Sequence, residues 1–225
     1  LPQHVGYIID GNRRWAKAHG LPKYEGHLAG YNAIKQTVID TIGSGVKFVS
    51  VFVFSTENWK REAKEVENLM QLTLRLAKVD VKELIDHDIR VLFVGSREGL
   101  SDKLNAAIDE SEAKTAHLTA GTVCICFNYG GHREVVDAVK AIVREGTHEA
   151  DVTDQLITDH LYQPDVPPID IVVRTSGEQR ISNFMLWRIA YSELLFLEKN
   201  WPDMTKQDVA AILEEYTRRK RRFGG

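Results

Sequence analysis

The stretch VGYIIDGNRRWAK, residues 5–17, joins an apolar run of strand length to a glycine turn and then to the start of a helix. Five more apolar runs of strand length lie at 48–54, 89–94, 123–127, 169–173 and 194–197. Helix-period segments fill most of the gaps between these runs, and continuous apolar strands that alternate with helices indicate a largely parallel sheet covered on both faces. We therefore predict an α/β fold in which helices flank a mostly parallel, six-stranded sheet, with a single domain over residues 1–225.

The composition is that of an ordinary globular protein. The 225 residues, 43% hydrophobic and 27% charged, can bury a core without cross-links. The net charge of −3 does not favour a nucleic-acid partner, so any phosphate site must be local. No apolar stretch approaches the roughly 20 residues that span a bilayer. A disulfide between Cys124 and Cys126, two apart in an apolar run, would be strained, so we expect reduced thiols in a cytoplasmic protein.

Polar residues and turn formers follow four of the apolar runs, at 10–12, 55–58, 128–131 and 174–178. Because ligands of open α/β sheets bind outside the carboxyl ends of the strands, we expect these four turns to converge on one site. Turns also favour such residues for conformational reasons alone. That explanation accounts for the glycines and asparagines of these turns. It does not account well for Asp10 directly after a strand, or for Arg174 and Arg180 around a glycine turn.

Asp10 precedes a helix start that carries Arg13, Arg14 and Lys17. A helix N-terminus with added cations favours a diphosphate. A lone carboxylate beside a polyanion is unfavourable unless it recruits a metal, and Mg²⁺ bridges carboxylates to substrate phosphates. We therefore predict Mg²⁺ as cofactor and Asp10 as its ligand, the alternative being an N-cap role for Asp10. The segment matches neither the dinucleotide-binding fingerprint nor the P-loop.

A second phosphate site is predicted at 174–183, where Arg174, Arg180 and Ser182 lie close together in the sequence. The planar fork of arginine suits phosphate oxygens, and serine adds a neutral donor. The alternative is an arginine pair bound to Glu178 on a solvated loop.

Both segments, together with Gly26-His27, the stretch 55–61 and the ending Arg221-Arg222-Phe223-Gly224-Gly225, resemble undecaprenyl diphosphate synthase and its relatives, the cis-prenyltransferases. The resemblance runs from His4 to Gly225. It implies a fold with an apolar tunnel and a Mg²⁺-dependent reaction that condenses isopentenyl diphosphate with an allylic diphosphate, such as geranyl or farnesyl diphosphate. The product would be a Z-configured polyprenyl diphosphate.

The resemblance also implies a role for individual residues. Asp10 would hold Mg²⁺ against the allylic diphosphate, and the residues around that substrate would be Gly11, Asn12, Arg13, Arg14, Trp15 and Lys23. The diphosphate of isopentenyl diphosphate would bind Arg174, Arg180 and Ser182, with Glu193 as a metal ligand on that side. Between the two substrates would lie the catalytic residues His27, Ser55 and Asn58, with Glu57, Trp59 and Arg61 as further substrate contacts.

Three departures from the family pattern concern the substrates. Lys23 stands where many relatives carry an arginine, so it keeps the charge but loses the bidentate fork. Arg13 and Ser176 stand where glycine is more usual. These changes leave the product length open: undecaprenyl diphosphate for a cell-wall lipid carrier is the default, and a short Z-prenyl diphosphate of specialised metabolism is the alternative.

The helix-period segment from Val66 to Ile85 carries a second apolar stripe of Leu72, Leu76 and Val79. A helix buried between neighbours would produce the same pattern. The resemblance implies instead that this helix lines the tunnel, whose bottom sets how many prenyl units fit.

Other interpretations remain open at this point. The cations of 218–222 complement a helix dipole or make transient contact with an anionic membrane. The resemblance implies a homodimer, to which 194–197 could contribute. A catalytically silent partner subunit would be expected to lack Asp10 and its glycine turn. A metal-dependent phosphohydrolase would need more carboxylates than Asp10 and Glu193.

Overall fold

The structure is a computed structural model that describes residues 1–219. Its six strands form one sheet of order β3-β4-β2-β1-β5-β6, in which every neighbouring pair is parallel. The strands are β1 (His4–Ile8), β2 (Phe48–Ser55), β3 (Ile89–Val94), β4 (Gly121–Tyr129), β5 (Ile171–Arg174) and β6 (Glu193–Phe196). The predicted α/β fold with a six-stranded parallel sheet is confirmed, because each strand forms from one of the six apolar runs.

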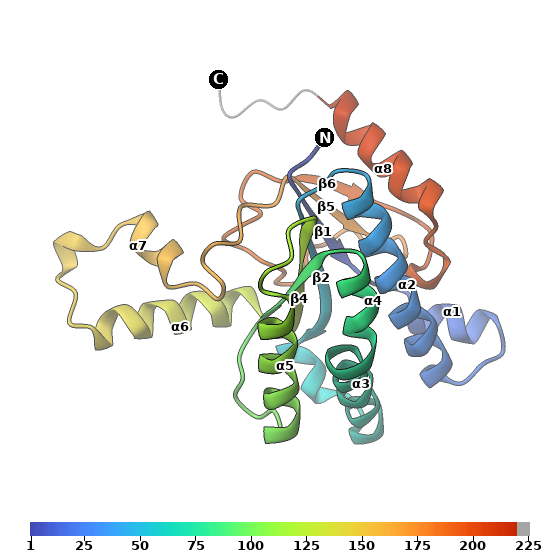
Figure 1. The fold of residues 1–225 in the computed structure, drawn as a ribbon, viewed down its shortest axis with the longest axis horizontal. Coiled ribbons are helices and arrows are strands. Elements are labelled where there is room, and N and C mark those ends of the chain that lie inside the picture. The colour runs from blue at the N-terminus through green and yellow to red at the C-terminus, as the bar shows by residue number, and fades with distance from the viewer. Residues whose placement is uncertain (220–225) are drawn as a thin grey trace.

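Helices fill the connections between the strands, except the one from β5 to β6 (Figure 1). They are α1 (Asn12–Ala18), α2 (Lys23–Gly43), α3 (Ala63–Arg75), α4 (Val81–Asp86), α5 (Asp102–Thr115), α6 (Gly131–Arg144), α7 (Asp154–Asp159) and α8 (Lys206–Arg218). Shorter turns are η1 (Thr56–Lys60), the π-helical η2 (Leu76–Asp80), η3 (Glu149–Asp151) and η4 (Trp201–Asp203). Side-chain caps mark several helix starts; Ser101 begins α5 and Thr205 begins α8.

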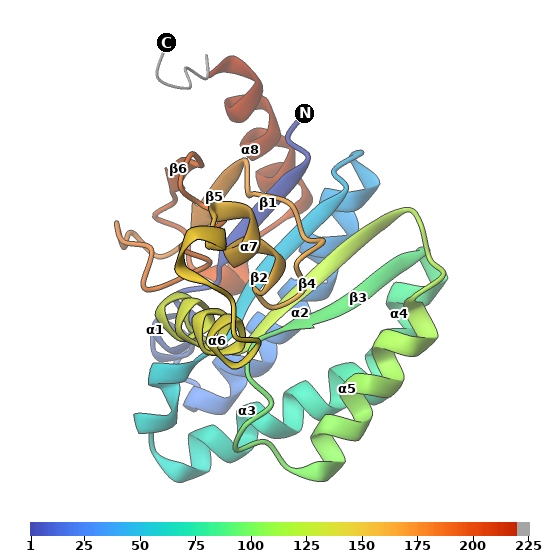
Figure 2. The ribbon, with the colours of Figure 1, turned by 90° about the vertical axis from the view of Figure 1, so that its left-hand side faces the viewer.

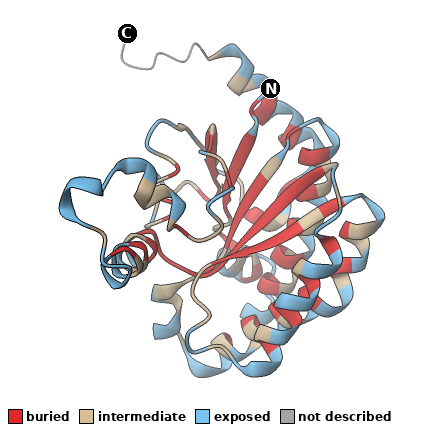
Figure 3. Cartoon of the chain, turned by 60° about the vertical axis from the view of Figure 1, so that its left-hand side comes forward, coloured by how far each residue is buried: buried red, intermediate tan, exposed pale blue. Residues whose placement is uncertain are grey.

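The sheet separates two hydrophobic cores. Side chains of α2, α3, α4, α5 and α8 pack against one face of the sheet, and on the other face the strands pack against side chains from 162–189. Figure 2 shows α6 and α7 on the opposite side of the sheet from α5. Figure 3 shows the strands buried between helices whose outer faces are exposed. Burial on both faces explains the nearly continuous apolar runs.

The structure also bears on two smaller predictions, one about the cysteines and one about membrane-spanning segments. Cys124 and Cys126 are buried and unpaired, as expected. None of the helices in residues 1–219 is both long enough and apolar enough to cross a membrane.

The segment expected to be one helix from Val66 to Ile85 is interrupted. It consists of α3, the π turn η2 and α4. A π turn shifts the phase of the residues that follow it, and Leu72 and Leu76 are buried while Val79 is 62% exposed. The prediction that Val79 belongs to an inward apolar stripe is therefore wrong, and Leu72 and Leu76 carry that stripe.

The strand register determines which turns meet. Ile8 at the end of β1 lies opposite Phe52 on one side and Arg174 on the other. Because all strands run the same way, Asp10, Ser55 and Arg174 reach the same edge of the sheet. This carboxyl edge is where the cavity described next opens.

Candidate active site

A cavity of about 1240 Å³ opens at the carboxyl edge of the sheet, between the sheet and helices α1, α2 and α3. Its outer part, the cationic mouth, is lined by Asp10, Gly11, Asn12, Arg13, Arg14, Lys17, Lys23, His27, Ser55, Glu57, Asn58, Arg61, His132, Arg174, Arg180, Ser182 and Asn183. Its inner part, the apolar interior, is lined by Ile8, Ile9, Tyr31, Ile34, Phe52, Val53, Leu69, Leu72, Leu76 and Ile125, with Ala16 and Thr73, and the exposed Leu21 and Pro22 also line the cavity. The cavity thus joins a strongly charged entrance to a hydrocarbon-like pocket.

Cations outnumber anions in the mouth. Its positive side chains are Arg13, Arg14, Lys17, Lys23, Arg61, Arg174 and Arg180, against the carboxylates of Asp10 and Glu57. Such an excess inside a concave site raises the local potential for polyanions, even though the whole chain is slightly acidic.

Asp10 lies at the centre of the mouth. Its Oδ2 accepts a hydrogen bond from Arg174 Nη2 at 2.9 Å, and its Oδ1 accepts one from the backbone N–H of Gly11 at 2.8 Å. The hydroxyl of Thr175 donates to the carbonyl of Asp10 at 2.6 Å and accepts from its N–H at 3.0 Å. These bonds fix the turn after β1 against the turn after β5.

The donors around Asp10 fit a magnesium ion that depends on substrate for its other ligands. The carboxylate is 30% exposed and belongs to the wall of the cavity. Residues 1–219 contain no group of three or more His, Cys, Asp or Glu side chains that could hold a metal. Mg²⁺ is commonly held by one or two carboxylates together with substrate phosphates and water. Asp10 would therefore be the protein ligand in this mouth.

Gly11 is required by the geometry of this turn. Its φ is +105°, a conformation that favours glycine, and a Cβ there would lie 2.4 Å from Asn200 Oδ1. Ser176, in the glycine turn after β5, has a φ of +74°. Its hydroxyl donates to Asn200 Oδ1 at 2.9 Å, so the serine holds a left-handed conformation with a local hydrogen bond.

The residues of the second predicted phosphate site gather around Arg174. Its Nη1 donates to Ser182 Oγ at 2.7 Å and to the carbonyl of Arg180 at 2.5 Å, and its side chain is 5% exposed. Arg180 is 59% exposed and pairs with Glu178, which also pairs with Arg14 at 2.9 Å. Arg180 is thus paired with Glu178, as the alternative interpretation expects, and it also lines the cavity; phosphate binding by this segment stays a prediction.

A buried ion network supports the wall between α2 and α3. The Oε1 of Glu65 lies 3.1 Å from His27 Nε2 and 3.0 Å from Arg61 Nη1. Burial lowers the pKa of His27, and the neighbouring Glu65 only partly opposes this, so the imidazole is neutral at neutral pH. Burial alone would raise the pKa of Glu65, but the positive charges of Arg61 and Arg13 and the hydrogen bond from His27 lower it. Glu65 is therefore a carboxylate that holds both cavity-lining side chains.

Gly26 lets the network reach the mouth. A Cβ at this position would lie 2.1 Å from the carbonyl oxygen of Asn12, so only glycine allows α2 to approach α1 this closely. The approach places His27 beside the first substrate-binding segment.

Ser55 and Asn58 line the mouth but also hold a turn. The Ser55 side chain accepts from the backbone of Asn58, and the Asn58 Oδ1 accepts from the N–H of Ser55 at 3.1 Å. This reciprocal cap starts η1 and presents Glu57 and Arg61 to the cavity. The catalytic role predicted for Ser55 and Asn58 stays a prediction.

Three predicted site residues are not brought to the cavity. The indole N–H of Trp15 donates to Asp203 Oδ1, and that of Trp59 donates to Asn128 Oδ1, both at 2.8 Å and outside the cavity wall. Glu193 begins β6, beside Ile171 at the amino end of β5, and pairs with Arg219 at 3.0 Å. Glu193 therefore lies at the opposite end of the parallel strands from Asp10 and does not line the cavity, and its predicted role as a metal ligand stays a prediction.

The four predicted turns do not all reach the cavity. The turns at 10–12, 55–58 and 174–178 contribute residues to its wall, whereas 128–131 lies behind it. There the N–H of Gly131 donates to the carbonyl of Asn183 at 2.8 Å and holds the loop that carries Ser182. The motif 221–225 lies outside the described residues.

Sequence reasoning missed Glu65, Tyr31 and His132. Glu65 could have been found, because it occupies the position one turn before Leu69 on the inward stripe of α3, where a charged residue is unexpected. Tyr31 gave no such signal, because the apolar residues of α2 are not concentrated on one face of the helix. His132 gave none because it follows an ordinary glycine turn.

Comparisons with known proteins agree with this geometry. Residues 8–224 match the family described as "Putative undecaprenyl diphosphate synthase". The isoprenyl transferase of Thermotoga maritima is 45% identical over 100% of this chain and 97% of its own length, and that of Listeria innocua is 42% identical over 100% and 91%.

Solved structures share the fold over the same length. Lavandulyl diphosphate synthase from Lavandula x intermedia, in complex with dimethylallyl diphosphate, has a TM-score of 0.95 at 32% identity and covers 100% of this chain and 98% of its own. A Campylobacter jejuni protein described as "a probable undecaprenyl diphosphate synthase" has a TM-score of 0.84 at 27% identity, with 100% and 99% covered.

The chain therefore belongs to the cis-prenyltransferase family of undecaprenyl diphosphate synthases. It is an enzyme of the isoprenyl transferase type, which confirms the predicted reaction class.

Proposed function

We propose that this enzyme condenses isopentenyl diphosphate with an allylic diphosphate and releases a Z-configured prenyl diphosphate. The observation that carries the proposal is the continuity of one cavity, with a cationic mouth for two diphosphates and an apolar interior for a hydrocarbon tail. The proposal rests on the family membership for the reaction class and on this cavity for the substrate class.

The charges of the mouth suit the bond changes of such a reaction. The allylic carbon–oxygen bond breaks and leaves negative charge on diphosphate, the double bond of isopentenyl diphosphate attacks the allylic carbon, and a proton leaves the new unit. Arg13, Arg14 and Arg174 would stabilise the departing diphosphate more strongly in the transition state than before it. A magnesium ion bound to Asp10 would supply further stabilisation of that negative charge.

Holding both substrates at the carboxyl edge would provide the orientation part of the rate enhancement. Arg174 donates to Asp10 with one guanidinium nitrogen and to Ser182 with the other. A side chain that contacts both predicted diphosphate regions can set the distance between the two substrates. The neutral His27 imidazole beside Arg61 is the candidate to receive or relay the released proton.

Two product classes follow from the same reaction. A long product such as undecaprenyl diphosphate accords with the family description, and a short Z-prenyl diphosphate accords with the likeness to lavandulyl diphosphate synthase. The apolar interior accommodates the tail in both cases, so the product length depends on where that interior ends.

The homodimer expected from the resemblance would use the edge of the sheet. β6 is an edge strand, and Leu194 on it is 40% exposed. The membrane interpretation of 218–222 has less support in its described part, because Arg218 and Arg219 pair with Glu215 on their own helix.

The reaction is tested with radiolabelled isopentenyl diphosphate and Mg²⁺, offering dimethylallyl, geranyl and farnesyl diphosphates in turn. Wild-type protein should incorporate label into a prenyl product, and Asp10→Ala should lower the rate by about 10²-fold or more. Asp165→Ala, which removes an exposed carboxylate away from the cavity, is the matched control. Removal of Mg²⁺ by EDTA should abolish activity, and adding Mg²⁺ back should restore it. If folded wild-type protein extends no primer, the proposal fails and a non-catalytic partner role replaces it.

A further inference from the structure

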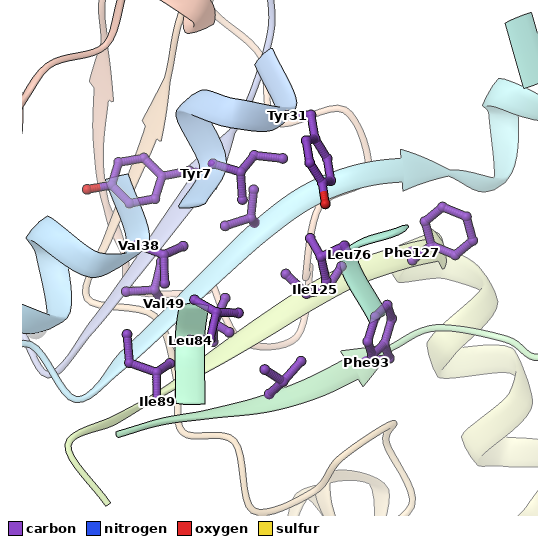
Figure 4. Packing of buried hydrophobic residues seen from close by; sticks show 14 of the residues in the cluster. Tyr7, Tyr31, Val38, Val49, Leu76, Leu84, Ile89, Phe93, Ile125 and Phe127 are labelled. Atoms are coloured by element: carbon purple, nitrogen blue, oxygen red, sulfur yellow. The ribbon is translucent and has the colours of Figure 1, made fainter. Parts of the chain in front are cut away.

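The apolar interior has a defined inner end. It is bounded by Tyr31 and Ile34 of α2, Leu72 of α3, Leu76 of η2 and Ile125 of β4. Buried core residues that do not line the cavity lie beyond this end, among them Val38 of α2, Val49 of β2 and Leu84 of α4 (Figure 4). The cavity therefore ends at this set of side chains, and Ile34 as well as Tyr31 belongs to its inner end.

Tyr31 is the polar exception in this apolar end. It is 5% exposed, and its hydroxyl donates to Asp80 Oδ2 in the π turn η2. Figure 4 shows the ring extending from α2 toward Leu76 and Ile125. The side chain therefore bridges α2 to the break between α3 and α4, across the inner end of the cavity.

Asp80 is itself held in place by cations. Its carboxylate lies 3.1 Å from Arg75 Nε and 3.6 Å from Lys35 Nζ, and its side chain is 11% exposed. Lys35 also pairs with Glu83 at 2.9 Å and lies 5.9 Å from the centre of the Tyr31 ring. A hydrogen bond to an ionised acceptor is among the stronger kinds, so the position of the phenol is fixed by a network and not by packing alone.

The bridge ends in the π turn η2. Leu76 begins this turn and lines the cavity, and Asp80, four residues later, ends it and accepts the hydrogen bond from Tyr31. The neighbouring Thr73 donates its hydroxyl to the carbonyl of Leu69 at 2.9 Å, so its polar atom is satisfied within the helix. Single π turns in helices are frequent at functional sites, and here the turn lies beside the inner end of the cavity.

We propose that Tyr31, held by Asp80, closes the inner end of the apolar interior and limits the length of the prenyl chain. Tyr31 is the specificity-determining residue, and Asp80 is a positioning residue that acts through it. This inference rests on the proposed function, since a chain-length limit has meaning only for an elongating enzyme. A growing tail that reaches the ring can advance only if the phenol leaves its charged acceptor and α2 separates from η2.

The test measures product length with one allylic primer and excess labelled isopentenyl diphosphate. Tyr31→Ala removes the ring, Tyr31→Phe keeps the ring but removes the hydroxyl, and Asp80→Ala removes the acceptor. Tyr24→Ala is the matched control, because Tyr24 lies on the same helix, is 41% exposed and does not line the cavity.

We expect Tyr31→Ala to lengthen the main product by one or more isoprene units. Tyr31→Phe and Asp80→Ala should broaden the product distribution toward longer chains, and Tyr24→Ala should leave it unchanged. Thermal unfolding of each variant separates a change of specificity from a loss of fold. Should Tyr31→Ala not fold, Tyr31→Leu provides the same test with a shorter apolar side chain.

The outcomes are distinguishable. A wild-type protein that incorporates no label overturns the proposed function itself. An active, folded Tyr31→Ala variant with the wild-type product length overturns the role of Tyr31. Longer products from Tyr31→Ala but unchanged products from both Tyr31→Phe and Asp80→Ala would overturn the role of Asp80 and leave only the bulk of the ring.

Discussion

The carboxylate of Asp10 and the guanidinium of Arg174 form a hydrogen-bonded ion pair at 2.9 Å, although they are 164 residues apart in the chain. The pair joins the turn after β1 to the end of β5, which are neighbouring parallel strands. It places the candidate metal ligand beside the most buried cation of the second predicted phosphate site.

Replacing Arg174 with lysine should lower kcat/KM by about 10²-fold, because the ammonium cannot donate to Asp10, Ser182 and the carbonyl of Arg180 together. Steady-state kinetics with both substrates varied would measure this. Arg144→Lys on exposed α6 is the control. Equal kinetics for Arg174→Lys and wild type would contradict the role given to the guanidinium.

Glu65→Gln should lower kcat by about tenfold or more. The free energy of unfolding should fall by less than the activation free energy rises. The amide can still accept a hydrogen bond, but it no longer balances the charge of Arg61 or holds His27. Kinetics and chemical denaturation should be measured together. Glu67→Gln, an exposed position on the same helix, should match wild type. A stability loss that fully accounts for the activity loss would show that Glu65 is only structural.

Trp15→Phe and Trp59→Phe should each retain kcat/KM within about threefold, because neither indole lines the cavity. Each substitution removes one hydrogen bond, worth about 1 kcal/mol, to Asp203 and Asn128 respectively. Urea denaturation would register that small loss. A large rise in KM for either variant would place the indole at the substrate and contradict the geometry.

His4 should make the fold sensitive to acid. It is fully buried between Ser50 Oγ and the carbonyl of Pro167, both at 2.8 Å, and burial lowers its pKa from 6.5 to about 4. The unfolded chain therefore binds this proton at a higher pH than the folded one, so stability is complete above about pH 6.5 and falls as the pH drops toward 4.

The contribution lost over this range is about 3 kcal/mol. Denaturation at about pH 7 and about pH 4.5 would measure it. His4→Gln does not titrate, so its stability should change less between the two pH values than that of wild type. An identical change in both proteins would mean that other groups cause the acid sensitivity.

Leu194→Lys should weaken self-association if the edge strand β6 forms a dimer interface. The substitution places a charge on a side chain that is 40% exposed in the single chain, where desolvation of the ammonium would oppose burial. Sedimentation velocity of wild type and variant would measure the shift from dimer toward monomer. Val152→Lys, an exposed apolar position between η3 and α7 and outside β6, is the control.

The fold class could be predicted because burial on both faces forces long apolar runs, and turns after parallel strands must meet at one edge. The same reasoning identified Asp10, Arg174 and Ser182, which lie at or near strand ends. The position of Glu193 could also have been predicted. It directly precedes the apolar run 194–197, so it belongs to the amino edge of the sheet, away from Asp10.

The sequence by itself determined which side chains the carboxyl edge would carry, because that depends only on chain order and strand direction. Only the tertiary structure decided that Glu65 joins His27 to Arg61, that Trp15 and Trp59 turn away, and that Tyr31 meets Asp80 at the inner end of the cavity. Those outcomes depend on how helices pack against one another and on a single π turn that changes the phase of the residues after α3. Side-chain volumes and helix packing angles govern such contacts, and the apolar periodicity of one segment determines neither of them.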